Sequence, residues 1–144
     1  MSSDAVTENT RAIVDLFWRT MNGGDPQRIQ EFVERHFSED LEWSVVGTGV
    51  PGAGSHKGRQ TVLRVIGSVR GLFEPGYPRG EVLHQVVEGE WAAAEARASG
   101  PLRDGRRYEN RYAFFIRVRG ERIEVVREYF DSYYVNQLIG DHIE

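Results

Sequence analysis

The chain contains 144 residues, which is the length of one domain and enough to bury about two thirds of the surface of the unfolded chain. Its formal net charge of −4 at pH 7 argues against a nucleic-acid footprint, and the absence of cysteine excludes disulfides and cysteine metal sites. No apolar run approaches the roughly 18 residues of a membrane span, so we expect a single domain over residues 1–144 with no nucleic-acid or membrane partner.

The N-terminal segment, residues 1–10, contains no basic region followed by an apolar block. We therefore expect no signal peptide and a cytoplasmic location. Across the whole chain one lysine, Lys57, stands against seventeen arginines, which is typical of a GC-rich bacterial gene.

Two helices are predicted at the start of the chain. In residues 7–22 apolar side chains recur at spacings of three and four, and Asn22-Gly23-Gly24 supplies a left-handed residue that ends the helix. Asp25-Pro26 then begins a second helix, with aspartate as the N-cap and proline at the first helical position. Because the link is so short, the two helices must pack on each other or on a common sheet.

A strand is predicted over residues 41–46, and a glycine-rich loop follows it. Residues 47–52 satisfy the G-x-G-x-x-G pattern of dinucleotide-binding proteins. We reject that interpretation, because the pattern should open a helix directly inside a parallel βαβ unit, and here proline and further glycines intervene. The loop is better explained as a flexible segment at the mouth of a pocket. A third helix is predicted over residues 58–73, where Pro75 and Gly76 stop it.

The remaining chain is predicted to form strands and turns. Short links join the expected strands into an antiparallel meander covered on one face by the helices. The arginines between residues 103 and 127 are interpreted as a solvated sheet face and turns. Residues 132–140 are expected to lie across an open end of the sheet. The predicted strands are residues 81–87, 91–99, 108–118 and 122–130.

Alternation within these strands indicates which side chains face inward. In the 108–118 strand, Asn110 and Tyr112 share the inner face with aromatic and aliphatic residues, so they are either satisfied within the core or bind a ligand. In the 122–130 strand, a count of apolar residues slightly favours the face of Ile123, Val125, Arg127 and Tyr129 as the inner one, which would turn Glu128 outward.

The 91–99 strand carries Glu95 and Arg97 on one face and four alanines on the other. Alternation alone favours Glu95 and Arg97 as an ordinary exposed pair. If they lined a pocket instead, they would have to pair, because an unpaired buried charge costs several kcal/mol, roughly. The alanine face, together with Phe115, suits a sheet-to-sheet dimer contact.

The order helix, helix, strand, glycine-rich loop, helix and four-stranded meander resembles the SnoaL-like and ketosteroid-isomerase-like branch of the nuclear transport factor 2 (NTF2-like) superfamily. The best landmarks are Asn22-Gly23-Gly24-Asp25, Gly58-Arg59 and Arg127-Glu128-Tyr129-Phe130-Asp131. The resemblance covers nearly the whole chain. It implies an α+β, cone-shaped fold with three helices from the N-terminal half on a curved, mainly antiparallel sheet around one pocket. It also implies a homodimer through the convex sheet face, and it directs Glu95, Arg97 and Glu128 into the pocket.

The activities known in this superfamily can be compared with the chain position by position. The resemblance places Phe17 and Val45 where ketosteroid isomerases carry a tyrosine and an aspartate base, so steroid isomerisation is not expected. Limonene-epoxide hydrolases carry an Arg-x-Asp pair and a last-strand aspartate where this chain has Glu95-x-Arg97 and Glu128, and their water-holding residues are absent here. SnoaL-type cyclases close a ring with acid and base groups and no metal, which Glu128 and Glu95 could support.

Two alternatives follow for function. The chain is either a cofactor-independent enzyme of the cyclase, isomerase or hydrolase type acting on a hydrophobic small molecule, or a binding or dimeric assembly module with the same pocket. No set of His, Asp and Glu has metal-ligand spacing, so no metal and no cofactor are expected. The predicted catalytic residues are Glu128, Glu95, Arg97 and Tyr112, and the predicted substrate-binding residues are Trp18, Trp43, Phe73, Asn110, Phe114 and His56.

Overall fold

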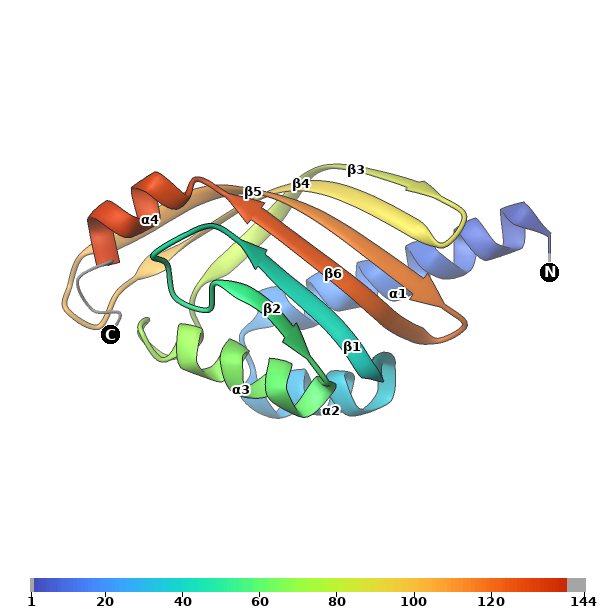
Figure 1. The fold of residues 1–144 in the computed structure, drawn as a ribbon, viewed down its shortest axis with the longest axis horizontal. Helices are drawn as coiled ribbons and strands as arrows, with labels where there is room; N and C mark the ends of the chain where they lie inside the picture. The colour runs from blue at the N-terminus through green and yellow to red at the C-terminus, as the bar shows by residue number, and fades with distance from the viewer. Residues whose placement is uncertain (1, 140–144) are drawn as a thin grey trace.

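The computed structural model describes residues 2–139, so residues 1 and 140–144, including Gly140 of the predicted closing segment, lie outside the described part. Helices and strands follow one another through this range as Figure 1 shows. They are α1 (Ser3–Gly23), α2 (Pro26–His36), β1 (Phe37–Val46), β2 (Gly54–Lys57), α3 (Arg59–Arg70), β3 (Arg79–Glu88), β4 (Trp91–Pro101), β5 (Arg107–Arg119), β6 (Arg122–Phe130) and α4 (Ser132–Ile139).

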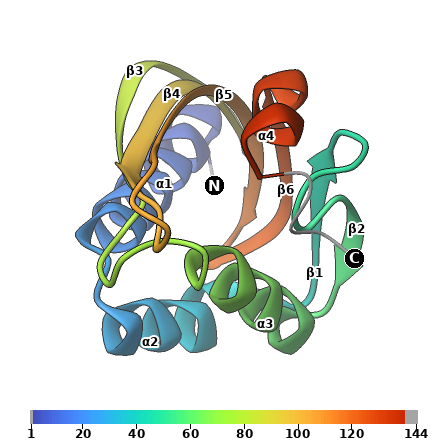
Figure 2. The same ribbon diagram turned by 90° about the vertical axis from the view of Figure 1, so that its left-hand side faces the viewer.

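The strands form one curved sheet in the order β2-β1-β6-β5-β4-β3. Strands β3 to β6 pair antiparallel as the predicted meander, β2 pairs antiparallel with β1, and β1 runs parallel to β6. Figure 2 shows the sheet curling around α1, with α2 and α3 below it and α4 beside the ends of β5 and β6. The predicted α+β fold is therefore confirmed, with β2 and α4 as additions to the expected elements.

Local signals explain where the first two helices begin and end. The side chain of Ser2 caps α1 by accepting a hydrogen bond of 3.1 Å from the Ala5 amide, so α1 begins four residues earlier than predicted. It ends at Gly24, whose φ of +71° favours glycine; a Cβ there would also meet the Gly76 carbonyl oxygen at 2.4 Å. Asp25 caps α2 as predicted, by accepting from the Gln27 amide at 3.0 Å.

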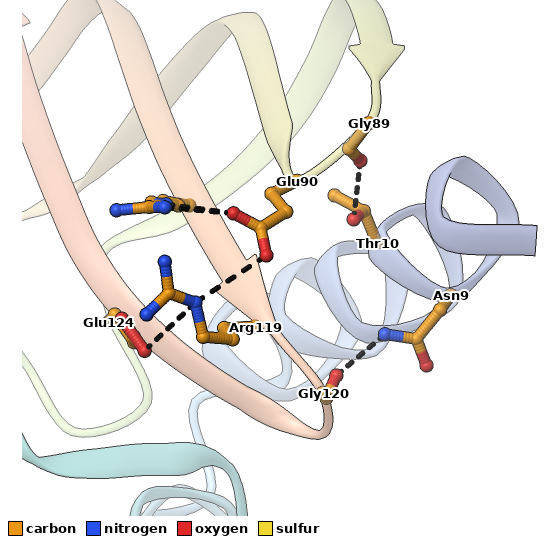
Figure 3. Close-up of polar contacts among 8 residues, drawn as sticks. Asn9, Thr10, Gly89, Glu90, Arg119, Gly120 and Glu124 are labelled. Carbon is orange, nitrogen blue, oxygen red and sulfur yellow. Dashed lines mark hydrogen bonds and ion pairs between the residues drawn. The ribbon is translucent and has the colours of Figure 1, made fainter. Parts of the chain in front are cut away.

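One end of the fold is closed by polar contacts between α1 and two sheet turns (Figure 3). Thr10 Oγ1 donates to the Gly89 carbonyl at 2.7 Å, and Asn9 Nδ2 donates to the Gly120 carbonyl at 2.6 Å. Glu90 pairs with Arg119 beside these contacts. Figure 1 shows these turns at the end of the sheet remote from α4. These contacts do not close the opposite end of the sheet, so a cavity can open there.

The structure corrects the inner face of β4. Ala92, Ala94 and Ala96 are buried, while Glu95 is exposed on the opposite face. The small alanine side chains allow α1 to pack closely over this strand. The register implied by the resemblance is therefore wrong for Glu95, and the alanines are not available for a dimer contact through the outer face of the sheet.

The structure also corrects the inner face of β6. The pairing of β5 with β6 shifts between Arg117 and Val118, so that Arg117 opposes Val125 and Val118 opposes Ile123. This bulge adds one unpaired residue, Glu124, and reverses the alternation after it. As a result Val126 is buried and Glu128 faces inward. The apolar count predicted the opposite face and was wrong, whereas the register implied by the resemblance was right for this strand.

Candidate functional site

A cavity of about 200 Å³ opens between the sheet and the helices α1, α3 and α4. Its wall is mostly aromatic and aliphatic, and a few polar side chains interrupt it, as in most small-molecule sites. The apolar lining includes Phe17, Trp18, Met21, Trp43, Val62, Ile66, Phe73, Phe114, Phe130, Val135 and Ile139. The polar lining includes Asn22, His56, Arg70, Tyr108, Tyr112 and Glu128.

Glu128 presents a carboxyl group to this cavity from β6. It lies between Phe114 of β5 and Val45 of β1 across the sheet, so its partners on the two neighbouring strands are apolar. The indole Nε1 of Trp43 donates a hydrogen bond of 3.2 Å to its Oε1. Burial raises the pKa of Glu128 to about 7, although the Trp43 hydrogen bond lowers it in part. Near neutral pH this carboxyl is therefore present in both protonation states.

Two tyrosines on β5 stand beside this carboxyl. The hydroxyl groups of Tyr108 and Tyr112 are hydrogen-bonded to each other. Burial is the main cause that raises the pKa of Tyr108 to about 12 and that of Tyr112 well above its usual value, and the negative charge of Glu128 is a smaller contribution in the same direction. Both hydroxyls are therefore neutral over the physiological pH range and can donate hydrogen bonds.

Asn110 holds the tyrosine pair in place through a hydrogen bond to Tyr108. Its Nδ2 donates to the Tyr108 hydroxyl and to the Asp131 carbonyl, each at 3.2 Å. Asn110 is buried and does not line the cavity. Its predicted role in contacting a ligand is therefore wrong, and the alternative of a satisfied core asparagine is the correct one.

His56 lies on the short strand β2, opposite Trp43 of β1. Its Nε2 is 2.6 Å from the Gly52 carbonyl oxygen, so the ring is hydrogen-bonded across the turn that precedes the strand. Both His56 and Pro51 line the cavity. The glycine-rich segment thus borders the cavity as expected, and part of it is a strand.

The structure brings most of the predicted site residues together and places two of them, Glu95 and Asn110, outside the cavity. Glu95 lines a more open depression on the outer face of the sheet, with His84 and Arg111. Arg97 borders the cavity, but its guanidinium pairs with Glu81, and these two side chains are 43% and 56% exposed. The predicted acid–arginine–acid group therefore does not form. Of the predicted residues, the cavity is lined by Glu128, Tyr112, Arg97, Trp18, Trp43, Phe73, Phe114 and His56, whose roles stay predictions.

Tyr108 and Arg70 are among the cavity residues that lie outside the predicted set. Tyr108 shares the inner face of β5 with Tyr112, and the alternation that identified Tyr112 applies equally to it. Arg70 follows Ile66 by four residues and precedes Phe73 by three, so helical spacing places it on the apolar stripe of α3. An arginine on an apolar stripe was the signal that could have identified it.

Within residues 2–139, no group of three or more His, Asp or Glu side chains is arranged to hold a metal ion. No helix in the same range is long and apolar enough to cross a membrane.

Comparisons with known proteins agree on one family and one fold. A family model described as a SnoaL-like domain matches residues 14–126. No curated protein matches the chain significantly. Among solved structures, a putative SnoaL-like polyketide cyclase from Jannaschia sp. CCS1 has a TM-score of 0.79 at 12% identity, covering 94% of both chains.

Two further solved structures have the same fold. An NTF2-like protein from Burkholderia xenovorans LB400 has a TM-score of 0.71 at 24% identity, covering 91% of this chain and 95% of that one. A hypothetical protein with a ketosteroid-isomerase-like fold from Catenulispora acidiphila, in complex with trimethylamine, has a TM-score of 0.71 at 16% identity, covering 92% and 97%. At these identities the likeness establishes the fold alone.

Proposed function

The chain belongs to the SnoaL-like domain family, and we propose that it is a cofactor-independent enzyme that moves a proton on a hydrophobic small molecule, with Glu128 as the acid/base group. The observation that carries the proposal is the carboxyl of Glu128, which faces an apolar cavity and has its pKa raised by burial to about 7. A catalytic acid/base group works best when its pKa lies near the working pH.

The tyrosine pair supplies the second half of the proposed chemistry. The Glu128 carboxylate takes a proton from a carbon next to a carbonyl group, and the electron pair moves to the carbonyl oxygen. The Tyr112 hydroxyl donates a hydrogen bond to that oxygen and stabilises the developing negative charge. The Tyr108 hydroxyl, held by Asn110, positions Tyr112. Glu128 then returns the proton at a new position or after ring closure.

This step suits a cyclase or an isomerase better than an epoxide hydrolase. Hydrolysis of an epoxide by this fold requires groups that hold and activate a water molecule, and the positions matched to that role are Trp43 and Val45. Membership of the SnoaL-like domain family supports the cyclase type.

The test begins with the ligand that the protein retains. Native purification followed by mass spectrometry of the released small molecules identifies candidate substrates, and each candidate is incubated with wild-type protein and with Glu128→Gln. We expect the wild type to convert a retained compound and the variant to bind it without conversion. Equal conversion by both proteins would remove Glu128 from the mechanism. Return of every retained compound unchanged by the wild type would favour a binding module.

The outer face of the sheet supports a second proposal, a homodimer. Phe115 and Tyr129 make an edge-to-face contact there, with ring centroids 6.0 Å apart, although they are 43% and 41% exposed. Val86 and Trp91 are also exposed. Large apolar side chains gathered on one face commonly mark a contact between proteins. A second copy of the chain placing the same face against this one would cover them.

A further inference from the structure

Arg70 brings a guanidinium group without a partner to the cavity. It lies in the last turn of α3 and lines the cavity next to Val69 and Phe73. Its Nη2 is buried and makes no hydrogen bond. No ion pair joins the side chain to an acid within residues 2–139. Other arginines of the sheet are paired, such as Arg117 of β5 with Glu90.

An unpaired guanidinium that is partly buried is unfavourable for folding. Arginine stays charged at every pH that a folded protein tolerates, and a buried charge is costly unless an opposite charge compensates it. Burial is the cause of the lowered pKa of Arg70, with no contribution from an acid. A partner supplied by a bound molecule would compensate this charge.

Glu128 is not that partner, although it lines the same cavity. The pKa of Glu128 responds to burial and to the Trp43 hydrogen bond, and Arg70 does not contribute to it. The carboxyl with its tyrosines on the sheet and the guanidinium on α3 are therefore two separate polar groups in the cavity wall. Apolar side chains form most of the remaining wall. A ligand that binds both groups must have an apolar body, with one polar group facing Glu128 and its tyrosines and another facing Arg70.

We propose that Arg70 binds a carboxylate group of the ligand, so that the substrate class is an apolar, ring-containing carboxylic acid. The inference rests on the proposed function, because it places this ligand in the same cavity as Glu128. The planar guanidinium matches a carboxylate with two parallel hydrogen bonds, and the buried Nη2 has the donors for one of them. Held there, the carboxylate fixes the orientation of the ring body toward Glu128.

The test compares two probes of nearly equal shape, 2-naphthoate and its neutral analogue 2-naphthamide. Binding is measured by calorimetry at pH 6, where naphthoate is ionised and Glu128 is mostly protonated. We expect the wild type to bind naphthoate at least tenfold more tightly than naphthamide. Arg70→Met should abolish this preference and keep the affinity for naphthamide. Arg64→Met removes a charge from the exposed side of the same helix and should behave as the wild type.

A melting temperature separates ligand binding from a structural role. Since Arg70→Met removes an unpaired, partly buried charge, we expect it to melt no lower than the wild type in the absence of ligand. A variant that melts lower and loses both probes would overturn the assignment, because Arg70 would then support the fold. An Arg70→Met variant that still prefers naphthoate would also overturn the assignment, and so would a wild type that binds both probes equally. In either case the apolar cavity would still be a binding site. A wild type that binds neither probe overturns the proposed function together with the inference.

Discussion

Trp43 and Glu128 come from neighbouring strands, β1 and β6, and the indole Nε1 of Trp43 donates a hydrogen bond of 3.2 Å to the carboxyl of Glu128. This bond favours the ionised carboxylate, while burial favours the neutral acid. The two effects oppose each other, and burial is the larger. The balance sets the pKa of Glu128 to about 7 and gives the cavity its acid/base group.

Replacement of Trp43 by phenylalanine should raise the pKa of Glu128 above about 7, because the carboxylate loses its hydrogen-bond donor. The rise should be roughly one pH unit, since a hydrogen bond to a charged group contributes about 1.5 kcal/mol or more. Carbon-13 NMR of the Glu128 carboxyl across a pH series measures this pKa in the wild type and in the variant. Trp18→Phe is the matched control, because Trp18 lines the same cavity but donates to Gln85. An unmoved midpoint in Trp43→Phe would show that the bond does not tune Glu128.

Glu128 should also make stability depend on pH. Its pKa is about 7 in the folded protein against an ordinary value of 4.5, so the folded state binds the proton more tightly between these two pH values. The contribution of Glu128 to the free energy of unfolding is therefore largest below pH 4.5, decreases as the pH rises from 4.5 to 7, and is constant above pH 7. The whole change should be roughly 3 kcal/mol, since each pKa unit of difference between the folded and unfolded states corresponds to about 1.4 kcal/mol.

Glu128→Gln isolates this contribution. The glutamine cannot ionise, so the variant should match the wild type near pH 4.5 and become the more stable of the two above pH 7. Urea unfolding at a series of pH values measures the difference, and other titrating groups cancel because both proteins carry them. A difference that does not change with pH would mean that Glu128 titrates at its ordinary value.

The proposed dimer depends on the exposed aromatic pair of the outer sheet face. Phe115→Glu places a charge beside Tyr129 and should weaken self-association at least tenfold, because a charge buried in an interface without a partner is costly. Sedimentation velocity over micromolar concentrations measures the change. Tyr133→Glu is the control, since Tyr133 is 74% exposed on α4 and lies outside this face. A monomeric wild type, or a Phe115→Glu variant that dimerises as the wild type does, would contradict the interface.

Most of the fold could be predicted because its signals are local. Asp25-Pro26 and Gly24 mark helix boundaries through backbone geometry that neighbouring residues alone determine. The four meander strands follow from β-forming runs separated by short turns. Strand β2 could not be recognised, since Gly54–Lys57 carries no apolar alternation and is a strand only through its pairing with β1.

The candidate site was less predictable because its geometry depends on contacts between distant segments. The unpaired residue at Glu124 reverses the alternation of β6, and no residue type in that stretch marks a bulge. Glu95 was misplaced because the resemblance carried a register to a strand whose alanines pack beneath α1. Arg70 occupies an apolar helix face, yet only the packed structure distinguishes a cavity from a filled core there.

If Glu128 acts as a base inside an apolar cavity, the protein should catalyse the ring opening of 5-nitrobenzisoxazole. A base removes the single proton on the heterocyclic carbon, the N–O bond breaks, and a coloured nitrophenolate forms. We expect the wild type to accelerate this reaction, with a rate that rises with pH and levels off above about pH 7, and Glu128→Gln to react no faster than buffer. Equal rates for the two proteins, or a wild-type profile that levels off near pH 4.5, would contradict this role of Glu128.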